Sequence, residues 1–374
     1  MAGTERVLIV YASAGHGHEK AARGVEEALL HAAPGADVTT VDSIAVGRGF
    51  FAWLYRFTYF VQIKHAPWLW GFFYYSFDQD WVYAWLRYVR RAYNALNFAP
   101  FERYLVDKAP TTVVATHFQA VEVVSHLKRR GLLKSRLAVV ITDYLPHHVW
   151  IDEQVDLYAV ACDSTREDLL RRGVPAERIR VTGIPVERKF FRSSGRAEVR
   201  RALGLDETLF TALVTSGGAA IGALGDIVRE LIGEGVNAQV LCVCGTNAAL
   251  RASLEPLTQG HTQLRLYGFV DNMHELMEAS DVVIGKGGGL TVTESLCKGR
   301  PLILYRPVPG QEGRNARVLQ SEGAALVAAT PRVIGAYVRE LIDSPDKRRQ
   351  LSSGAERLRR PGAAADIAGE VLRA

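Results

Sequence analysis

Residues 281–315 read DVVIGKGGGLTVTESLCKGRPLILYRPVPGQEGRN, and this stretch decides the expected fold. The segment Asp281–Ile284 predicts a short buried strand, and four of the next five residues are glycines that lead into a predicted helix near Thr291. Because glycine has no Cβ, backbone N–H groups can approach a phosphate closely, and the N-terminus of the following helix favours negative charge. A second predicted strand, Pro301–Tyr305, is followed by polar side chains that can bind hydroxyl groups: Gln311, Glu312 and Asn315. The pattern indicates a phosphate cradle that suits a nucleotide sugar better than a free nucleotide.

The same glycines also allow a simpler interpretation. They can be ordinary loop residues, with Thr291 and Glu294 forming a capping box at the start of the helix. Glycine-rich turns from strand to helix are common in α/β proteins, so the stretch by itself leaves both interpretations open.

Length and composition limit the class of protein. A chain of 374 residues exceeds what one hydrophobic core usually needs, so two domains are expected. Hydrophobic residues make up 48% and charged residues 23%, which is typical of globular proteins. The net charge of +5 is compatible with an anionic membrane surface or an acidic ligand, but it is too small to indicate nucleic acid. We therefore expect no nucleic-acid partner.

The cysteines and the hydropathy pattern bear on localisation. None of the four cysteines has a metal-binding or C-x-x-C spacing, and Cys242 and Cys244 alternate along an apolar strand pattern, which indicates reduced core residues. The N-terminus does not resemble a signal peptide, and no window reaches about 18 consecutive apolar residues. The prediction is a cytoplasmic protein, peripheral on the inner face of the cell membrane.

The start of the chain predicts the opening of a doubly wound sheet. Strand Val7–Ala12 leads into a glycine and histidine loop, a helix to about Ala32 and a strand at Val38–Val41. Further predicted strands alternate with helices at residues 112–115, 137–142, 157–162, 179–182, 210–214, 240–243 and 264–267. We expect an α/β fold with two Rossmann-like, doubly wound domains facing one interdomain cleft.

The expected domains follow from this alternation. Residues 1–191 would form an N-terminal acceptor domain, and residues 192–345 a C-terminal nucleotide-sugar domain. The charged segment Arg192–Asp206 is the candidate linker between them. Residues 346–374 are basic, helical and rich in alanine, and could pack back on the N-terminal domain.

Several polar residues follow strands of the first predicted sheet. His18 lies after the first strand, His117 after the strand at 112–115, and Asp143 and His147 after the strand at 137–142. The carboxyl ends of parallel strands meet at one edge of a sheet, so these groups are expected to form a site there. A lone histidine is more often structural than catalytic, but several at one edge make coincidence less plausible.

Residues 48–104 have an unusual composition. Between Phe50 and Tyr104 lie 22 of the chain's 34 aromatic residues, and residues 48–104 hold seven Lys/Arg against three acids, a net charge of +4. Aromatic and basic side chains on amphipathic helices are typical of segments that lie in a headgroup layer. The alternative is an aromatic core packed beneath the first domain. The candidate acceptor or membrane residues are Gly17, Trp53, Trp68, Trp70, Arg87, Arg90 and Arg91.

Motifs in order along nearly the whole chain resemble the GT-B glycosyltransferases that glycosylate diacylglycerol. That family includes the processive diacylglycerol glucosyltransferases and the monogalactosyldiacylglycerol synthases. The motifs are Gly15-His-Gly-His18, Thr142-Asp143-Tyr144 with His147 and Trp150, Thr182-Gly-Ile-Pro-Val186, Cys244-Gly-Thr-Asn247, Gly268-Phe-Val270, Gly287-Gly-Gly-Leu-Thr-Val-Thr-Glu294 and Pro309-Gly-Gln-Glu312 with Asn315.

The resemblance implies roles for individual residues. His18 aligns with a candidate base for the lipid hydroxyl, and Asp143 and His147 could orient or replace it. Glu294 would bind the ribose hydroxyls, and Gln311 and Glu312 the sugar hydroxyls. The remaining donor-site candidates are Gly217, Gly218, Gly245, Phe269, Val270, Gly287, Gly288, Gly289, Leu290, Thr291 and Asn315. No metal-binding Asp-x-Asp stands in the expected place, so neither a metal nor another cofactor is expected.

The predicted activity is inverting transfer of a hexose from UDP-glucose or UDP-galactose to the 3-hydroxyl of 1,2-diacylglycerol at an anionic membrane surface. The product would be a β-glycosyl diacylglycerol. Three alternatives remain open: the lipid-intermediate N-acetylglucosaminyltransferase of peptidoglycan synthesis, a soluble UDP-sugar epimerase and a non-catalytic membrane-binding module. Sequence does not choose between glucose and galactose or rank the three candidate bases.

Overall fold

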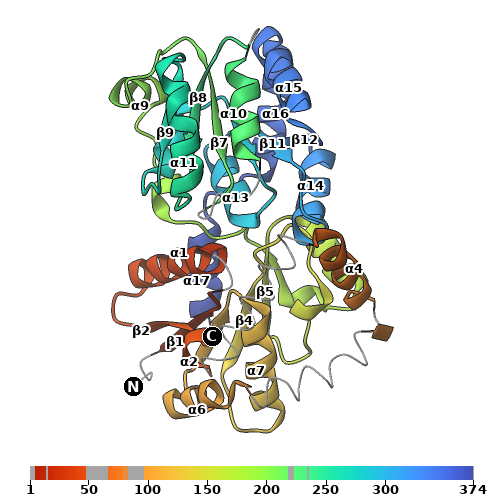
Figure 1. The fold of residues 1–374 in the computed structure, drawn as a ribbon. Coiled ribbons are helices and arrows are strands. Elements are labelled where there is room, and N and C mark those ends of the chain that lie inside the picture. The colour runs from red at the N-terminus through yellow and green to blue at the C-terminus, as the bar shows by residue number, and fades with distance from the viewer. Residues whose placement is uncertain are drawn as a thin grey trace. The chain divides into compact units, whose positions relative to one another are not determined.

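The computed structural model describes residues 5–13, 16–47, 66–79, 81–82, 97–217, 223–233 and 236–373. The chain divides into two compact units. The first comprises Met1–Arg188, Pro309–Gln311 and Arg360–Ala374, and the second comprises Lys189–Val308 and Glu312–Arg359. Among the described residues, each unit holds one parallel six-stranded sheet with helices alongside it (Figure 1). The predicted α/β fold with two doubly wound halves is confirmed.

The first sheet has the strand order β2-β1-β3-β4-β5-β6, and every neighbouring pair is parallel. Its strands are β1 (Arg6–Tyr11), β2 (Asp37–Asp42), β3 (Thr112–Ala115), β4 (Arg136–Val140), β5 (Leu157–Val160) and β6 (Ile179–Val181). Its helices are α1 (His16–Ala32), α2 (Ser43–Val46), α4 (Pro67–Phe77), α6 (Ala99–Lys108), α7 (Phe118–Arg129), α8 (Asp163–Arg171) and α17 (Ala363–Leu372), with short 3-10 turns η1 (His148–Trp150) and η2 (Ala176–Arg178). The sequence placed the strands within a few residues of these bounds.

Alternating side chains divide the first sheet between two cores. In β1, Val7 and Ile9 pack with Val25 and Leu29 of α1, and α17 joins the same cluster through Ile367. The next residues along the strand, Leu8 and Val10, belong to the opposite cluster, which includes residues of α6 and α7. Successive strand side chains point to opposite faces, so an apolar run such as VLIV is required where helices cover both faces. Figure 1 shows α1 and α17 side by side on their face of this sheet.

The second sheet has the order β12-β11-β10-β7-β8-β9 and is also parallel throughout. Its strands are β7 (Phe210–Thr215), β8 (Ala238–Val243), β9 (Leu264–Tyr267), β10 (Val282–Gly285), β11 (Leu302–Tyr305) and β12 (Ala325–Ala328). Its helices are α9 (Arg196–Ala202), α10 (Leu224–Ile232), α11 (Ala248–Leu254), α12 (Met273–Ala279), α13 (Gly289–Cys297), α14 (Gln311–Ser321), α15 (Pro331–Asp343) and α16 (Pro345–Leu358), with 3-10 turns η3 (Arg188–Phe190) and η4 (Glu255–Gln259). The central strands β7 and β10 are buried along their whole length.

The C-terminal segment forms two helices. Residues 345–358 form α16, which belongs to the second unit, and α17 belongs to the first. Pro361-Gly362 separates them, because proline and glycine both disfavour a continuous helix.

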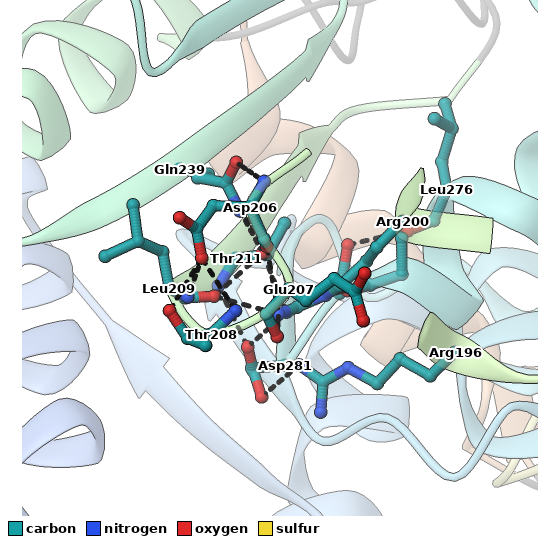
Figure 2. A network of polar contacts seen from close by, with 12 residues as sticks. Arg196, Arg200, Asp206, Glu207, Thr208, Leu209, Thr211, Gln239, Leu276 and Asp281 are labelled. Atoms are coloured by element: carbon teal, nitrogen blue, oxygen red, sulfur yellow. Dashed lines mark hydrogen bonds and ion pairs between the residues drawn. The ribbon is translucent and has the colours of Figure 1, made fainter. Parts of the chain in front are cut away.

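The interpretation of residues 192–206 as a linker is wrong. Residues 196–202 form α9, in which Val199 and Arg200 are buried. Figure 2 shows how the Arg200 guanidinium is held: it donates to Oδ2 of Asp281 at 3.0 Å and to Oγ1 of Thr211 at 2.8 Å. Further bonds run to the backbone carbonyls of Ala279, Asp206, Glu207 and Leu209.

This polar network joins α9 to the amino ends of two central strands. Asp281 directly precedes β10, and its Oδ2 also accepts the backbone N–H of Thr211 in β7 at 2.9 Å. Gln239 at the amino end of β8 donates to Oγ1 of Thr211 at 3.2 Å, which extends the network to a third strand (Figure 2). Removing a guanidinium from water is costly, and the hydrogen bonds to a carboxylate and several carbonyl oxygens offset this cost. Part of the charged segment predicted to be a linker is therefore buried in the second unit.

Candidate functional site

Each sheet reverses its strand order at one place, and in open α/β sheets ligands bind outside the carboxyl ends of the strands at that place. In the first sheet the reversal falls between β1 and β3, and in the second between β10 and β7. The first reversal brings together the segment after β1, which carries His18, and Thr116 after β3. The second brings the predicted phosphate loop after β10 to the end of β7.

His18 lies in the first turn of α1, and its ring is fixed through one nitrogen. Nδ1 lies 2.7 Å from the backbone carbonyl oxygen of Thr116 and 3.2 Å from Oγ1 of Thr142. A carbonyl oxygen only accepts hydrogen bonds, so the neutral ring carries its proton on Nδ1 and its lone pair on Nε2. This tautomer is the one that can take a proton through Nε2.

The surroundings of His18 keep it neutral. The His117 ring packs edge-on against it with 4.7 Å between centroids, and buried Trp150 lies at 6.4 Å. Desolvation lowers the pKa of His18 to about 4, and the hydrogen bond to Thr116 offsets this only in part. Near neutral pH the imidazole is therefore uncharged and able to accept a proton.

His147, the second histidine predicted to act at this edge, has both ring nitrogens occupied. Nδ1 accepts the backbone N–H of Val149 at 3.1 Å, so the proton lies on Nε2, which donates to the carbonyl oxygen of Tyr74 at 2.9 Å. The ring also packs edge-on against Tyr74, with centroids 4.5 Å apart. In this arrangement His147 caps the turn η1 and holds α4.

Asp143, the third candidate base, follows β4 and is 4% exposed. The Gln311 side-chain amide, which groups with the first unit, donates to its Oδ1. Because the Asp143 carboxylate receives a hydrogen bond in this way, it acts here as an acceptor that orients a neighbouring group.

Helix α4 presents aromatic rings to solvent and is anchored at its carboxyl end. Trp68 is 71% exposed and Phe72 is 64% exposed, whereas Trp70 is half-buried. Beyond the helix, Asp78 is buried and accepts two hydrogen bonds from the Arg172 guanidinium at 3.1 and 2.9 Å. The same carboxylate accepts the N–H of His148 at 2.7 Å. The exposed rings are thus carried on a helix that is fixed to the loop after β4.

In the second unit, the glycine that ends β10 and the glycines after it allow close backbone packing. A Cβ on Gly285 would lie 2.4 Å from the carbonyl oxygen of Thr215, and one on Gly287 would lie 2.9 Å from that of Glu312. Gly288 differs, because a Cβ there would meet no atom of the described residues within 4 Å, apart from its chain neighbours. Two of these glycines are therefore needed by the fold itself, and Gly288 borders open space.

The capping-box interpretation of Thr291 and Glu294 is wrong. Helix α13 begins at Gly289 with Gly288 as its N-cap, and no side chain caps it. Thr291 is therefore inside the first turn, where it cannot act as N-cap. Glu294 lies in the helix and is 3% exposed, so its burial needs an explanation other than capping.

Two residues of α14 bind backbone groups of neighbouring loops, Asn315 after β10 and Glu312 after β11. Asn315 is fully buried, and its side-chain N–H donates to the carbonyl oxygen of Gly287 at 2.9 Å. Glu312 accepts the backbone N–H of Val308 at 2.9 Å, and burial raises the pKa of its carboxyl group. The sequence predicts both residues at the donor site, and in the structure Asn315 holds the loop backbone at Gly287.

The remaining candidate site residues differ in backbone conformation, exposure and place in the fold. Gly217 after β7 and Gly245 after β8 have positive φ values of 70° and 54°, and the Phe269 side chain is 60% exposed. Gly17 lies in α1, Val270 is half-buried, and Gly289, Leu290 and Thr291 form the first turn of α13. The candidates that lie outside the described residues are Trp53, Arg87, Arg90, Arg91 and Gly218.

Two further findings concern metal and membrane. Among the described residues, no group of three or more His, Cys, Asp or Glu side chains could hold a metal ion. In the same part of the chain, no helix combines the length and apolarity needed to cross a bilayer.

Solved structures share this fold across nearly the whole chain. MurG of Acinetobacter baumannii has a TM-score of 0.62 at 15% identity, over 99% of this chain and 100% of that one. The UDP-GlcNAc 2-epimerase from Neisseria meningitidis, solved bound to UDP-GlcNAc, has a TM-score of 0.62 at 12% identity, over 99% and 100%. The fold is thus that of the GT-B proteins, and at such identities the likeness defines the fold alone.

Sequence comparisons identify the family. The Monogalactosyldiacylglycerol (MGDG) synthase model matches residues 18–186, and the Glycosyltransferase family 28 C-terminal domain model matches residues 211–366. The processive diacylglycerol beta-glucosyltransferase of Bacillus cytotoxicus is 30% identical over 98% of this chain and 93% of its own length. The enzyme of the same name from Bacillus subtilis is 29% identical over 99% and 95%. This chain belongs to the family of the processive diacylglycerol beta-glucosyltransferases.

Proposed function

We propose that this protein transfers a hexose from UDP-glucose or UDP-galactose to the 3-hydroxyl of diacylglycerol, with inversion at the anomeric carbon. Family membership supports the substrate classes, since relatives that match nearly the whole chain are named for diacylglycerol and for a beta-glucosyl product. Because the same fold also occurs in a UDP-GlcNAc 2-epimerase, the fold by itself does not distinguish glycosyl transfer from epimerisation. The observation that carries the proposal is the neutral His18 with its proton on Nδ1.

The proposed step uses His18 as general base. Nε2 takes the proton of the lipid hydroxyl while the hydroxyl oxygen forms a bond to the anomeric carbon. The bond from that carbon to the UDP oxygen breaks, and UDP leaves with the electron pair. A positioned base of this kind contributes about 10²- to 10⁴-fold to the rate. We assign no proton transfer to His147, because its hydrogen bonds engage both ring nitrogens, and we propose that Asp143 orients Gln311.

The leaving diphosphate would be stabilised by the loop after β10. Backbone N–H groups at the start of α13 and the positive end of its dipole favour negative charge there. Gly288 allows close approach, and buried Glu294 is the proposed acceptor for the ribose hydroxyls. In this proposal Gln311 and Glu312 contact the sugar. No metal is assigned, since fixed dipoles can supply the required potential.

We further propose that the protein works at an anionic membrane surface reached from the cytoplasm. Support comes from Trp68 and Phe72, which lie four residues apart on α4 and expose more than half of their surface. Trp81 is 79% exposed as well. Exposed aromatic side chains are costly in water and are stabilised in the interfacial layer of a bilayer.

One assay tests the activity. The full chain is incubated with radiolabelled UDP-glucose or UDP-galactose and diacylglycerol vesicles, with and without EDTA, and the products are resolved by thin-layer chromatography. Labelled lipid from one donor, formed equally with EDTA, is the expected result. Release of free sugar or interconverted nucleotide sugar without any labelled lipid would contradict the proposal. Dependence on a divalent ion would overturn the metal-free part alone.

A further inference from the structure

Two threonines on neighbouring strands hold His18. Thr116, directly after β3, engages it twice: its carbonyl oxygen lies 2.7 Å from Nδ1, and its hydroxyl donates to the His18 carbonyl oxygen at 3.0 Å. Thr142, after β4, is 2% exposed and places Oγ1 3.2 Å from the same Nδ1. The strand order brings these segments together, because β3 lies between β1 and β4.

The chemistry of these contacts fixes what Thr142 does. If the Thr142 hydroxyl donated to a bare Nδ1, the nitrogen lone pair would face the Thr116 carbonyl oxygen at 2.7 Å without a proton between them. Two electron-rich atoms at that distance repel each other. The N–H is therefore on Nδ1, shared between the carbonyl oxygen and the Thr142 oxygen, and both groups act as acceptors.

We propose that Thr142 is a positioning residue for the transfer reaction: its hydroxyl is the second acceptor that holds the His18 ring with Nε2 unprotonated and aimed for proton transfer. The inference rests on the proposed function of His18 as base. It adds a residue that touches neither substrate nor reacting atoms, and whose effect passes through the imidazole alone.

The packing around the His18 ring bears on how strongly loss of the Thr142 hydroxyl should affect it. The His18 ring contacts the rings of His117 and Trp150 on the first unit. His117 is the titratable group in ring contact with His18, and its own Nδ1 accepts the N–H of Gln119 at 3.2 Å, which places its proton on Nε2. Loss of one acceptor should weaken the hold on this N–H, because the contact between His18 and Thr142 lies in a partly buried site.

The test compares Thr142→Val with Thr142→Ser in the full-length protein. Valine keeps the shape and removes the hydroxyl, whereas serine keeps the hydroxyl. For the valine variant we expect kcat to fall about tenfold, the loss typical of one buried hydrogen bond, with KM for the UDP-sugar unchanged. Thr112→Val is the matched control, since Thr112 is buried at the opposite end of β3 from Thr116 and its hydroxyl makes no hydrogen bond within the part of the chain that the structure describes.

Nitrogen-15 NMR of selectively labelled histidines provides a readout that a purely structural role would not move. In the wild type, His18 should show a protonated Nδ1 and a bare Nε2. Thr142→Val should lower the pKa of His18 further, because the imidazolium loses an acceptor that stabilises its charge, and the acid limb of kcat/KM should move to lower pH with it. Thr142→Ser should leave both at the wild-type values.

The outcomes separate this inference from the proposed function. Wild-type kcat and an unmoved His18 titration in Thr142→Val overturn the role of Thr142, and Thr142→Ala supplies the same measurement if the valine variant does not fold. Bare Nδ1 in the wild type also overturns it. If instead the titration shifts as expected but His18→Ala retains turnover, Thr142 still positions the ring, and the assignment of His18 as base is the part that fails.

Discussion

The two sheets have the same number of strands and the same kind of strand reversal, yet they present different chemical groups at their carboxyl edges. The edge of the first unit presents side chains, with His18 held by Thr116 and Thr142. The edge of the second unit presents backbone, with glycines at 285, 287, 288 and 289 leading into α13. One fold thus offers two kinds of chemistry.

Under the proposed function, the two edges have different tasks. Proton transfer near neutral pH needs a titratable side chain that is neutral and correctly oriented. Binding of a diphosphate needs several N–H donors at close approach, which a side chain on the loop would obstruct. If this comparison is right, substitutions at the two edges should separate turnover from nucleotide binding.

The largest effect is expected for His18→Ala. Loss of the base should reduce turnover by about 10²-fold or more, while UDP affinity measured by calorimetry stays unchanged. The matched control is His31→Ala, an exposed histidine in the last turn of the same helix. Near-normal turnover in His18→Ala would transfer the base role to another group and remove the contrast between the two edges.

Gly288→Ala probes the second edge. A Cβ at this position would meet no atom of the described residues within 4 Å, so the melting temperature should fall by only a few degrees, the effect of losing a glycine N-cap. If the diphosphate approaches the backbone here, the methyl group should weaken UDP binding by about tenfold or more, since about 1.4 kcal/mol corresponds to a factor of ten. Gly260→Ala, equally open and in the same unit, is the control. Unchanged UDP affinity would mean that the phosphate lies elsewhere.

The pH profile sharpens the description of the first edge. His18 is neutral above its pKa of about 4. We therefore expect kcat/KM to be constant from pH 7 to about one unit above that pKa, and to fall near pH 4 as the ring gains a proton. Circular dichroism at each pH separates this limb from acid unfolding. An acid limb near pH 6.5, the ordinary value for histidine, would show that the ring is solvated during turnover.

A smaller effect is expected outside both edges. Replacing Trp68 and Phe72 together by Ala should weaken binding to anionic vesicles severalfold in flotation and leave UDP affinity unchanged, because interfacial binding scales with the apolar area inserted. Leu132→Ala, an exposed apolar residue on another segment of the first unit, should change nothing. Equal flotation of both variants would leave the exposed rings of α4 without a membrane role.

Much of the fold and several candidate site residues could be predicted from the sequence, because they depend on local patterns. Apolar runs such as VLIV at residues 7–10, followed by glycine loops, predict buried strands, and this run is part of β1. His18 and Asp143 could be named because each follows a predicted strand, and Glu294 was named through the resemblance to the family. The role of His147 could not be ranked, because it depends on Tyr74 of α4, which is distant in sequence.

The interpretation of residues 192–206 failed for a related reason. Arginine and serine suggest solvent, and only Asp281, about 80 residues further on, makes a buried Arg200 favourable. The capping-box alternative failed because Thr291 and Glu294 have the right spacing but the helix begins two residues earlier, at Gly289. Spacing alone does not show where the helix starts.

The sequence by itself therefore determined the alternation of strands and helices, the two doubly wound halves and the residues at their edges. These depend on periodicity and on backbone requirements within a few residues. Only the tertiary structure decided the tautomer of His18, the occupied nitrogens of His147 and the support of Gly287 by Asn315. Each of these depends on a hydrogen bond between segments far apart in the chain, and a hydrogen bond exists only when folding brings its two atoms within about 3 Å.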